Sequence, residues 1–358
     1  MKKTLIAVAA LAATTAFAQN VTVTGTLDAT YRSSKTETAG GTAVNTTRLG
    51  KDGIGTTGFT LAGTEDLGGG LKGVFLVENN FDVSNTGTEG SSSATGQRLS
   101  TGQVFVGVEG SFGSIKLGAA NSPTLTTQSG RAGSFGTKDG GRAALTANGY
   151  TTLMGLSVTR NDASFVYASP NFSGFSIGLA YSPKSDDGTT PGAGAMSDVG
   201  LNYANGPIAA GVSVFNQEIG SGYNDNTSTL VNTPAVATKS ALTTYFVTYD
   251  FKFAKFGLGG HTYKGSNAAS VDTVDNAGMN VLAEVPVTPA LALTVNYQRL
   301  DDKLTANADS TQTAVGAQYS LSKRSMAYAR YINQTADNAA GATVEKANRF
   351  LVGLRHNF

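Results

Sequence analysis

The sequence predicts an all-β fold, a transmembrane antiparallel β-barrel of about sixteen strands with one long loop folded into its interior. Apolar and polar residues alternate with period two in many segments, which is the pattern of strands that separate two unlike environments. After residue 18, no window approaches 18 consecutive apolar residues, so the sequence contains no candidate transmembrane helix. Tight turns and long polar loops alternate between the segments, as in barrels that cross a membrane.

The first 18 residues have the composition of an export signal. Lys2–Lys3 form a positive start, and the apolar stretch Leu5–Ala13 is far shorter than the ~20 residues of a spanning helix. Ala16–Ala18 supplies the small-x-small pattern of a cleavage site. We therefore expect a signal peptide over residues 1–18 and one outer-membrane barrel domain over residues 19–358.

Charge and cysteine content exclude several classes of function. Removal of the two lysines in the signal leaves 24 basic and 25 acidic residues, and this balance argues against a nucleic-acid partner. The chain has no cysteine, which excludes disulfides, a thiol nucleophile and a cysteine-type zinc site. Only 14% of the residues are charged and 45 are glycine, a composition that favours strands and turns over helices.

The alternation places unlike residues on the two faces of each predicted strand. Over Val21–Arg32 the odd positions carry Val, Gly, Leu, Ala and Tyr, and the even positions carry Thr, Asp and Arg. The last strand sets Phe350, Val352 and Leu354 against Arg349 and Arg355. Tyr and Phe near the ends of the apolar rows fit aromatic girdles at the membrane interfaces. A soluble sandwich or barrel is the alternative, but the chain has too few Ile and Leu for such a core.

A count of the segments gives sixteen strands, and boundary errors leave fourteen or eighteen open. The expected strands cover residues 20–32, 54–65, 70–83, 97–110, 113–119, 160–169, 173–182, 196–204, 207–217, 240–252, 255–264, 277–286, 290–300, 310–321, 325–334 and 346–358.

The connections orient the predicted barrel. Tight turns such as Gly68–Gly70 and Ser322–Arg324 mark a periplasmic end, and polar loops such as Glu218–Lys239 mark an extracellular end. The connection from about Ala120 to Thr159 is too long to be a simple link, and loops of this length are functional or disordered. We expect it to fold into the lumen and narrow it.

Several stretches resemble the trimeric general porins of Gram-negative bacteria, particularly those of the beta-proteobacteria. They span nearly the whole mature chain in family order, and Glu65–Gly70 and Arg355–Phe358 are the most specific of them. The stretches that carry the resemblance are Val21–Tyr31, Gly63–Phe75, Val106–Gly118, Tyr167–Phe175, Tyr319–Ser325 and Val352–Phe358.

The resemblance implies a sixteen-stranded barrel, a homotrimer and an inward-folded third loop. It also implies that the terminal Phe358 belongs to the signal read by the outer-membrane assembly machinery. The family usually sets arginines along the lumen wall at the positions that Gly58, Gly102 and Ala119 occupy here. The resemblance therefore does not carry an anion preference over to this chain.

Together these observations predict a porin of the cell outer membrane, embedded in the lipid bilayer, through which ions and small hydrophilic solutes diffuse passively. Basic side chains facing acids across a narrow aqueous gap select solutes by charge. The alternative for each candidate residue is that it is a solvated charge on a loop or at the rim of the barrel. The candidate constriction residues are Arg48, Glu78, Arg98 and Arg160 on the wall and Arg131, Lys138, Asp139 and Arg142 on the long loop.

An enzyme, a cofactor and a metal site are not predicted. A serine hydrolase needs a histidine beside its nucleophile, and the two histidines, His261 and His356, lie in predicted strands. No Gly-x-Ser-x-Gly, His-Glu-x-x-His or phosphate-binding Gly-Lys-Ser/Thr motif is present. Two non-enzymatic alternatives stay open. One is a substrate-specific channel, which shows saturable block by its solute; the other is a plugged structural or adhesive barrel, which shows no conductance steps.

Overall fold

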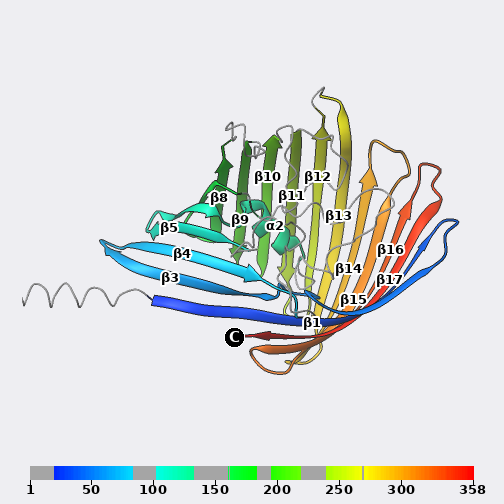
Figure 1. Ribbon diagram of the computed structural model, residues 1–358, viewed down its shortest axis with the longest axis horizontal. Coiled ribbons are helices and arrows are strands. Elements are labelled where there is room, and N and C mark those ends of the chain that lie inside the picture. The colour runs from blue at the N-terminus through cyan, green and yellow to red at the C-terminus, as the bar shows by residue number, and fades with distance from the viewer. Residues whose placement is uncertain are drawn as a thin grey trace, which may run out of the picture.

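The computed structural model describes residues 20–83, 102–132, 160, 162–183, 195–218, 239–267 and 270–358. These residues form one antiparallel β-sheet that closes on itself, with a single described helix, α2, against its inner side (Figure 1). The elements are β1 Asn20–Thr38, β2 Val44–Lys51, β3 Gly58–Gly68, β4 Leu71–Asn80, β5 Val104–Gly110, β6 Gly113–Ala119, α2 Pro123–Ala132, β7 Ser164–Ala168, β8 Phe175–Ser182, β9 Met196–Asn205, β10 Ile208–Glu218, β11 Lys239–Asp250, β12 Lys255–Ser266, β13 Asp272–Pro286, β14 Leu291–Asp302, β15 Ser310–Ser320, β16 Ser325–Asp337 and β17 Thr343–Asn357.

The described strands number seventeen but occupy sixteen positions around the barrel. β2 pairs with the second half of β1, from Ala29 opposite Lys51 onward, and β3 pairs with the first half, from Asn20 to Thr26. The two are therefore one interrupted strand. The prediction of a closed sixteen-stranded antiparallel barrel is confirmed. The expected strand bounds 20–32 and 54–65 are wrong here, because β1 extends to Thr38, β2 lies at Val44–Lys51 and β3 begins at Gly58.

The barrel closes where β1 pairs with β17 over thirteen residue pairs, from Thr26 opposite Asn357 to Thr38 opposite Glu345. Backbone hydrogen bonds in both directions join Gly25 to Phe358, each 3.0 Å long. The two ends of the described chain thus lie side by side, as Figure 1 shows for β1 and the C-terminus. Closure leaves no unpaired strand edge at this seam, which a barrel in lipid requires.

The two faces of the wall follow the predicted alternation. On β11, the outward Tyr245, Val247 and Tyr249 are exposed, whereas the inward Thr244 and Thr248 are buried. Outward aromatic side chains gather near the short-turn end, where Tyr249 and Phe251 lie 4.4 Å apart between ring centroids. An apolar outer band with an aromatic border suits lipid, and a polar inner row suits water.

The described part of the long loop folds inward, as predicted. Helix α2 follows β6 and contacts the inner side of the wall from β8 to β12 (Figure 1). Glycines make room for it. A Cβ added at Gly178 or at Gly200 would lie 3.0 Å from Pro123, and one at Gly259 would lie 2.5 Å from the Cγ of Arg131. Inward glycines therefore let the helix lie close against the sheet.

The remaining strand boundaries agree with the prediction to within a few residues, apart from β5, β13 and β7. β5 begins at Val104 instead of residue 97, with residues 97–101 outside the described part of the chain, and β13 begins at Asp272 instead of residue 277. The third exception is β7. This strand was expected over residues 160–169 but is confined to Ser164–Ala168, because Arg160 makes only an isolated bridge to Asn121. The turn from β3 to β4 uses three glycines with positive φ, Gly68, Gly69 and Gly70, at 83°, 62° and 82°. Within the described residues, no helix is both long and apolar enough to span a bilayer.

Candidate functional site

An arginine strip lines one wall of the lumen. In the strand register, Arg32 on β1 lies directly opposite Arg48 on β2, and Arg349 on β17 pairs with Ser34, two residues along β1 from Arg32. Arg48 and Arg349 are both close enough to Arg32 to repel it. Like charges placed opposite each other in a sheet are unfavourable for stability. We define the arginine strip as the inward arginines of β1, β2, β16 and β17, namely Arg32, Arg48, Arg330, Arg349 and Arg355.

Glu78 and Arg160 come together at a second place on the wall. Glu78 is an inward residue of β4, and its Oε2 accepts hydrogen bonds from the backbone N and the side-chain Nε2 of Gln103, at 3.1 and 3.3 Å. Gln103 Oε1 in turn accepts from the backbone N of Asn121, the bridge partner of Arg160. Burial lowers the pKa of Arg160, and the attraction of Glu78 and Asp162 opposes that shift.

Helix α2 is anchored at its N-terminus by a carboxylate from the part of the wall that it contacts. Asp198, on β9, is fully buried and accepts from Thr124 twice, from the backbone N at 2.9 Å and from Oγ1 at 2.7 Å. The Ser122 hydroxyl accepts from the backbone N of Leu125 at 3.2 Å, as an N-cap does. A carboxylate at this end also interacts favourably with the helix dipole.

The C-terminal end of α2 is anchored by Arg131, which is 1% exposed. Its Nε donates to the side chain of Asn280 on β13, and its Nη1 lies 2.8 Å from Nδ1 of His261 on β12. Asn280 Nδ2 donates back to the Arg131 carbonyl at 3.2 Å. Burial lowers the pKa of Arg131 to about 9, so the guanidinium stays protonated at neutral pH. Its head group thus contacts the wall.

The interruption between β2 and β3 bends into the lumen opposite α2. Asp28, fully buried on β1, accepts at Oδ2 from the backbone N of Ile54 and of Gly55, at 2.9 and 2.8 Å. Its Oδ1 accepts from the Tyr328 hydroxyl on β16. The inward bend, residues 52–57, begins at Asp52 with a left-handed φ of 62°. Two elements therefore narrow the lumen from different sides, α2 and this bend.

Beneath the inward bend lies a recess of about 360 Å³. Its walls are the inward positions of four neighbouring strands, in the order β17, β1, β3 and β4. One basic side chain, Arg355, and one acidic side chain, Glu78, line it among hydroxyl and carboxamide side chains. The polar residues that line this recess are Thr24, Thr26, Thr56, Thr60, Glu78, Asn80, Arg355 and Asn357.

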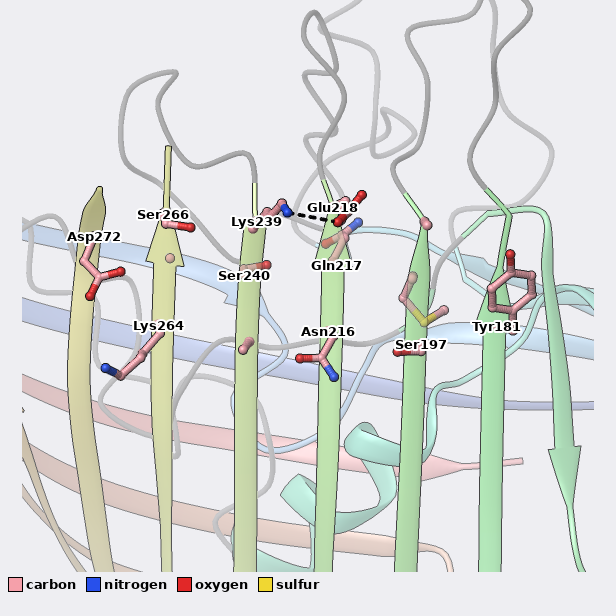
Figure 2. Close-up of a pocket in the computed structure, with 14 residues that line it drawn as sticks. Tyr181, Ser197, Asn216, Gln217, Glu218, Lys239, Ser240, Lys264, Ser266 and Asp272 are labelled. Carbon is pink, nitrogen blue, oxygen red and sulfur yellow. Dashed lines mark ion pairs between the residues drawn. The ribbon is translucent and has the colours of Figure 1, made fainter. Parts of the chain in front are cut away.

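A larger hollow of about 480 Å³ lies at the long-loop ends of β8 to β13 (Figure 2). Figure 2 shows Lys239 and Glu218 on adjacent strand ends, joined by an ion pair of 3.3 Å. Lys264, which also lines it, pairs with Asp275 at 3.0 Å. Both lysines at this rim are engaged by carboxylates, so the charges of the hollow balance locally.

Comparison with known proteins gives the family. The model of the Gram-negative porin family matches residues 4–339. The chain belongs to this porin family. The major outer membrane protein P.IB of Neisseria gonorrhoeae is 30% identical over the whole of both chains. Outer membrane porin protein 32 of Delftia acidovorans is 30% identical over 92% of this chain and 88% of its own.

The fold agrees with that of solved porins. The anion-selective porin from Comamonas acidovorans superimposes with a TM-score of 0.74, at 24% identity, over 95% of this chain and 100% of that one. The predicted resemblance to the beta-proteobacterial porins is confirmed. The chain is thus an outer-membrane porin that forms a channel through the membrane.

The porin structure brings some predicted site residues together and separates others. Arg48 lies in the arginine strip, Glu78 and Arg160 lie together, and Arg131 lies against the opposite wall. Phe358 lies at the closing seam. Arg98, Lys138, Asp139 and Arg142 lie outside the described residues.

Sequence reasoning did not single out Asp28, Asp198 or most of the arginine strip. The signal for the strip was present, because Arg32, Arg349 and Arg355 fall in the polar rows of the first and last strands. A closed barrel makes those two strands neighbours. No local pattern marks Asp198, because its partner Thr124 is 74 residues away. Within the described residues of the porin, no group of three or more His, Asp or Glu is placed to hold a metal ion.

Proposed function

We propose that this porin is a passive diffusion channel that favours small anions over cations. The observation that carries the proposal is the arginine strip, in which Arg32 and Arg48 face each other across the β1–β2 pair with Arg349 close by. Such an arrangement opposes folding stability. It is useful where mobile anions pass, because clustered positive charge in a narrow aqueous gap raises their local concentration.

Three carboxylates of the lumen wall are engaged by other groups, which supports an anion preference. Asp28 is occupied by two backbone N–H groups of the inward bend, and Asp198 is occupied by the N-terminus of α2. Glu78 is hydrogen-bonded to Gln103 and attracts Arg160. The Comamonas acidovorans protein with the same fold is described as anion-selective. The strip itself uses arginines at other positions than the three glycine and alanine sites where the family usually sets them.

The proposal includes the maturation and assembly expected from the sequence. Removal of residues 1–18 leaves the barrel domain, residues 19–358, which works as a homotrimer in the outer-membrane bilayer. The assembly machinery reads Phe358, and the channel performs no chemistry on its solutes. The exposed apolar outer band supports insertion into lipid, and the polar inner rows support a lumen filled with water.

Single-channel recording of the refolded mature protein in a planar bilayer, with reversal potential under a salt gradient, tests this function. We expect conductance in steps of three and a reversal potential whose sign shows that anions are more permeant than cations. Arg48→Gln is expected to move that potential toward cation preference. Arg299→Gln is the matched control, because this exposed arginine lies on the outer side and pairs with Asp301 and Asp309.

Silence from correctly folded trimers would instead establish a plugged structural barrel. A cation-sided potential in the unaltered protein would overturn the anion preference while leaving the channel in place.

A further inference from the structure

The recess beneath the inward bend is a candidate solute site on the lumen wall. Its lining positions share one face, because Thr26 pairs with Gly58 on one side and with Asn357 on the other, and Thr60 pairs with Glu78. The recess volume of about 360 Å³ corresponds to about twelve water molecules at ~30 Å³ each. A solute of a few heavy atoms fits there.

Arg355 is the only basic group in the described lining of the recess. Its Nε donates to Oδ1 of Asn357 at 3.3 Å, and its guanidinium lies 3.2 Å from the position that a Cβ at Gly55 would take. Asp28 is its register neighbour, but the oxygens of Asp28 bind the inward bend and Tyr328. Among the described residues Arg355 makes no ion pair. Its planar fork matches a carboxylate.

Glu78 is the only acidic side chain in the described lining of the recess. Its carboxylate already accepts from Gln103 and attracts Arg160, so it is held in place on the wall. Gly102 leaves the space that its side chain fills, because a Cβ there would overlap Glu78. A fixed carboxylate repels a second negative charge on a solute and attracts an ammonium group.

We propose that the recess is a binding subsite for neutral α-amino acids. Arg355 takes the solute carboxylate, Glu78 attracts the ammonium group, and the threonine hydroxyls and the amides of Asn80 and Asn357 replace water around them. The inference rests on the proposed channel function and names a substrate class for it. Anions in general are attracted by the arginine strip; the recess adds a preference that depends on two opposite charges in one solute.

Concentration-dependent reduction of single-channel current tests the proposal with three related probes. These are L-alanine, propionate, which lacks the ammonium group, and isopropylammonium, which lacks the carboxylate, all at constant ionic strength and pH 7. We expect saturable reduction by L-alanine, with half-saturation at a concentration at least tenfold below that of either other probe. Equal half-saturation by propionate would overturn the amino-acid class, and a linear response to all three would overturn the subsite.

Variants assign the effect to the recess. Arg355→Gln is expected to raise the alanine concentration at half-saturation about tenfold or more. Arg299→Gln removes the same charge from the outer side of the barrel, and its alanine half-saturation is expected to stay within about twofold of the original. Glu78→Gln is expected to erase the preference for alanine over propionate. An unchanged half-saturation in Arg355→Gln would place any binding elsewhere.

Arg355 lies near the closing seam, so its replacement can impair assembly. Arg355→Lys, which keeps the charge but loses the fork, and Thr60→Val, which keeps a strand-forming residue but loses a recess hydroxyl, provide folded alternatives. Each is expected to raise the alanine concentration at half-saturation several-fold. An unchanged concentration in both variants would refute the subsite. Absence of conductance in the unaltered protein, by contrast, would refute the proposed channel function.

Discussion

At the scale of single residues, like charges that face each other on the lumen wall lower the folding stability of the barrel. Arg32 and Arg48 face each other although like charges in that position disfavour the sheet. Asp28 and Asp198 are fully buried acids that hold backbone segments in place. These two acids thus fix the two elements that narrow the lumen.

Replacement of Arg160 tests the local charge balance around Glu78. Arg160→Ala removes the cation that Glu78 attracts, so the carboxylate faces the lumen with less compensation. We expect the ion selectivity to shift toward cations, measured as a change in reversal potential under a salt gradient. The control Arg299→Ala removes an exposed cation on the outer side, where it pairs with Asp301 and Asp309. An unchanged reversal potential in Arg160→Ala would remove Arg160 from the selective part of the wall.

At the scale of elements, α2 depends on its anchors more than on its own sequence. Its ten residues, Pro123–Ala132, include three threonines, a serine and a glycine, all weak helix formers. Asp198 and Ser122 hold its first turn, and Asn280 and His261 hold Arg131 in its last turn. Short isolated helices are marginal in water, so contacts with the wall stabilise this one.

A double-mutant cycle tests whether the anchors at the two ends of α2 are energetically coupled. Asp198→Asn replaces an acceptor oxygen with a donor, and Arg131→Gln leaves Asn280 and His261 without their partner; each is expected to cost about 1–3 kcal/mol of stability. The anchors lie about 12 Å apart along the helix, a distance at which effects usually add. We expect coupling of more than ~0.5 kcal/mol in thermal unfolding in detergent, together with noisier open-channel current.

Asp309→Asn is the control for this cycle. It breaks only the exposed pair with Arg299 at the rim and is expected to cost less than ~1 kcal/mol. Strict additivity of Asp198→Asn and Arg131→Gln would show that the two ends of α2 move separately.

The close approach of α2 to the wall gives another prediction. Gly200→Val places a branched side chain where even a Cβ lies 3.0 Å from Pro123, so we expect the helix to move toward the lumen axis and the conductance to fall. Gly50→Val is the matched control in β2, because a Cβ there meets nothing within 4 Å. A conductance loss in Gly50→Val as large as in Gly200→Val would contradict this role of the glycine.

The strands could be predicted from the sequence, but the elements inside the lumen could not. Period-two patterns appear because lipid and water face opposite sides of each strand. β2 was missed because Leu49 is the only apolar residue on its outward face. Helix α2 lacks helix-forming residues, and the inward bend depends on Asp28, 24 or more residues away. The recess exists only once β17, β1, β3 and β4 are neighbours.

At the scale of the whole molecule, one seam completes the barrel. β1 and β17 are more than 300 residues apart in sequence and pair along thirteen positions. Such non-local pairing forms late, because loop closure costs entropy before the contacts repay it. Gly25 and Phe358 stand at the short-turn end of this seam, joined by two backbone hydrogen bonds. The aromatic ring of Phe358 occupies the space that a Cβ at Gly25 would fill.

This contact separates two roles that Phe358 can have in assembly. Deletion of Phe358 removes both the ring and the two backbone hydrogen bonds, and we expect misassembled protein instead of heat-modifiable trimers in the outer membrane. Gly25→Val keeps Phe358 but displaces its ring, so it is expected to slow closure of the seam without affecting recognition of the terminal residue. Assembly is followed by the gel mobility of unheated samples over time.

The double variant Gly25→Val with Phe358→Ala decides between the two roles. If the ring acts by packing at the seam, the valine fills the space left by the ring, and assembly recovers relative to Phe358→Ala alone. If the assembly machinery reads the aromatic ring, the double variant assembles as poorly as Phe358→Ala. We expect the second result, because the ring is 43% exposed and one contact at a thirteen-pair seam adds little to closure. Recovery in the double variant would make Phe358 a packing residue.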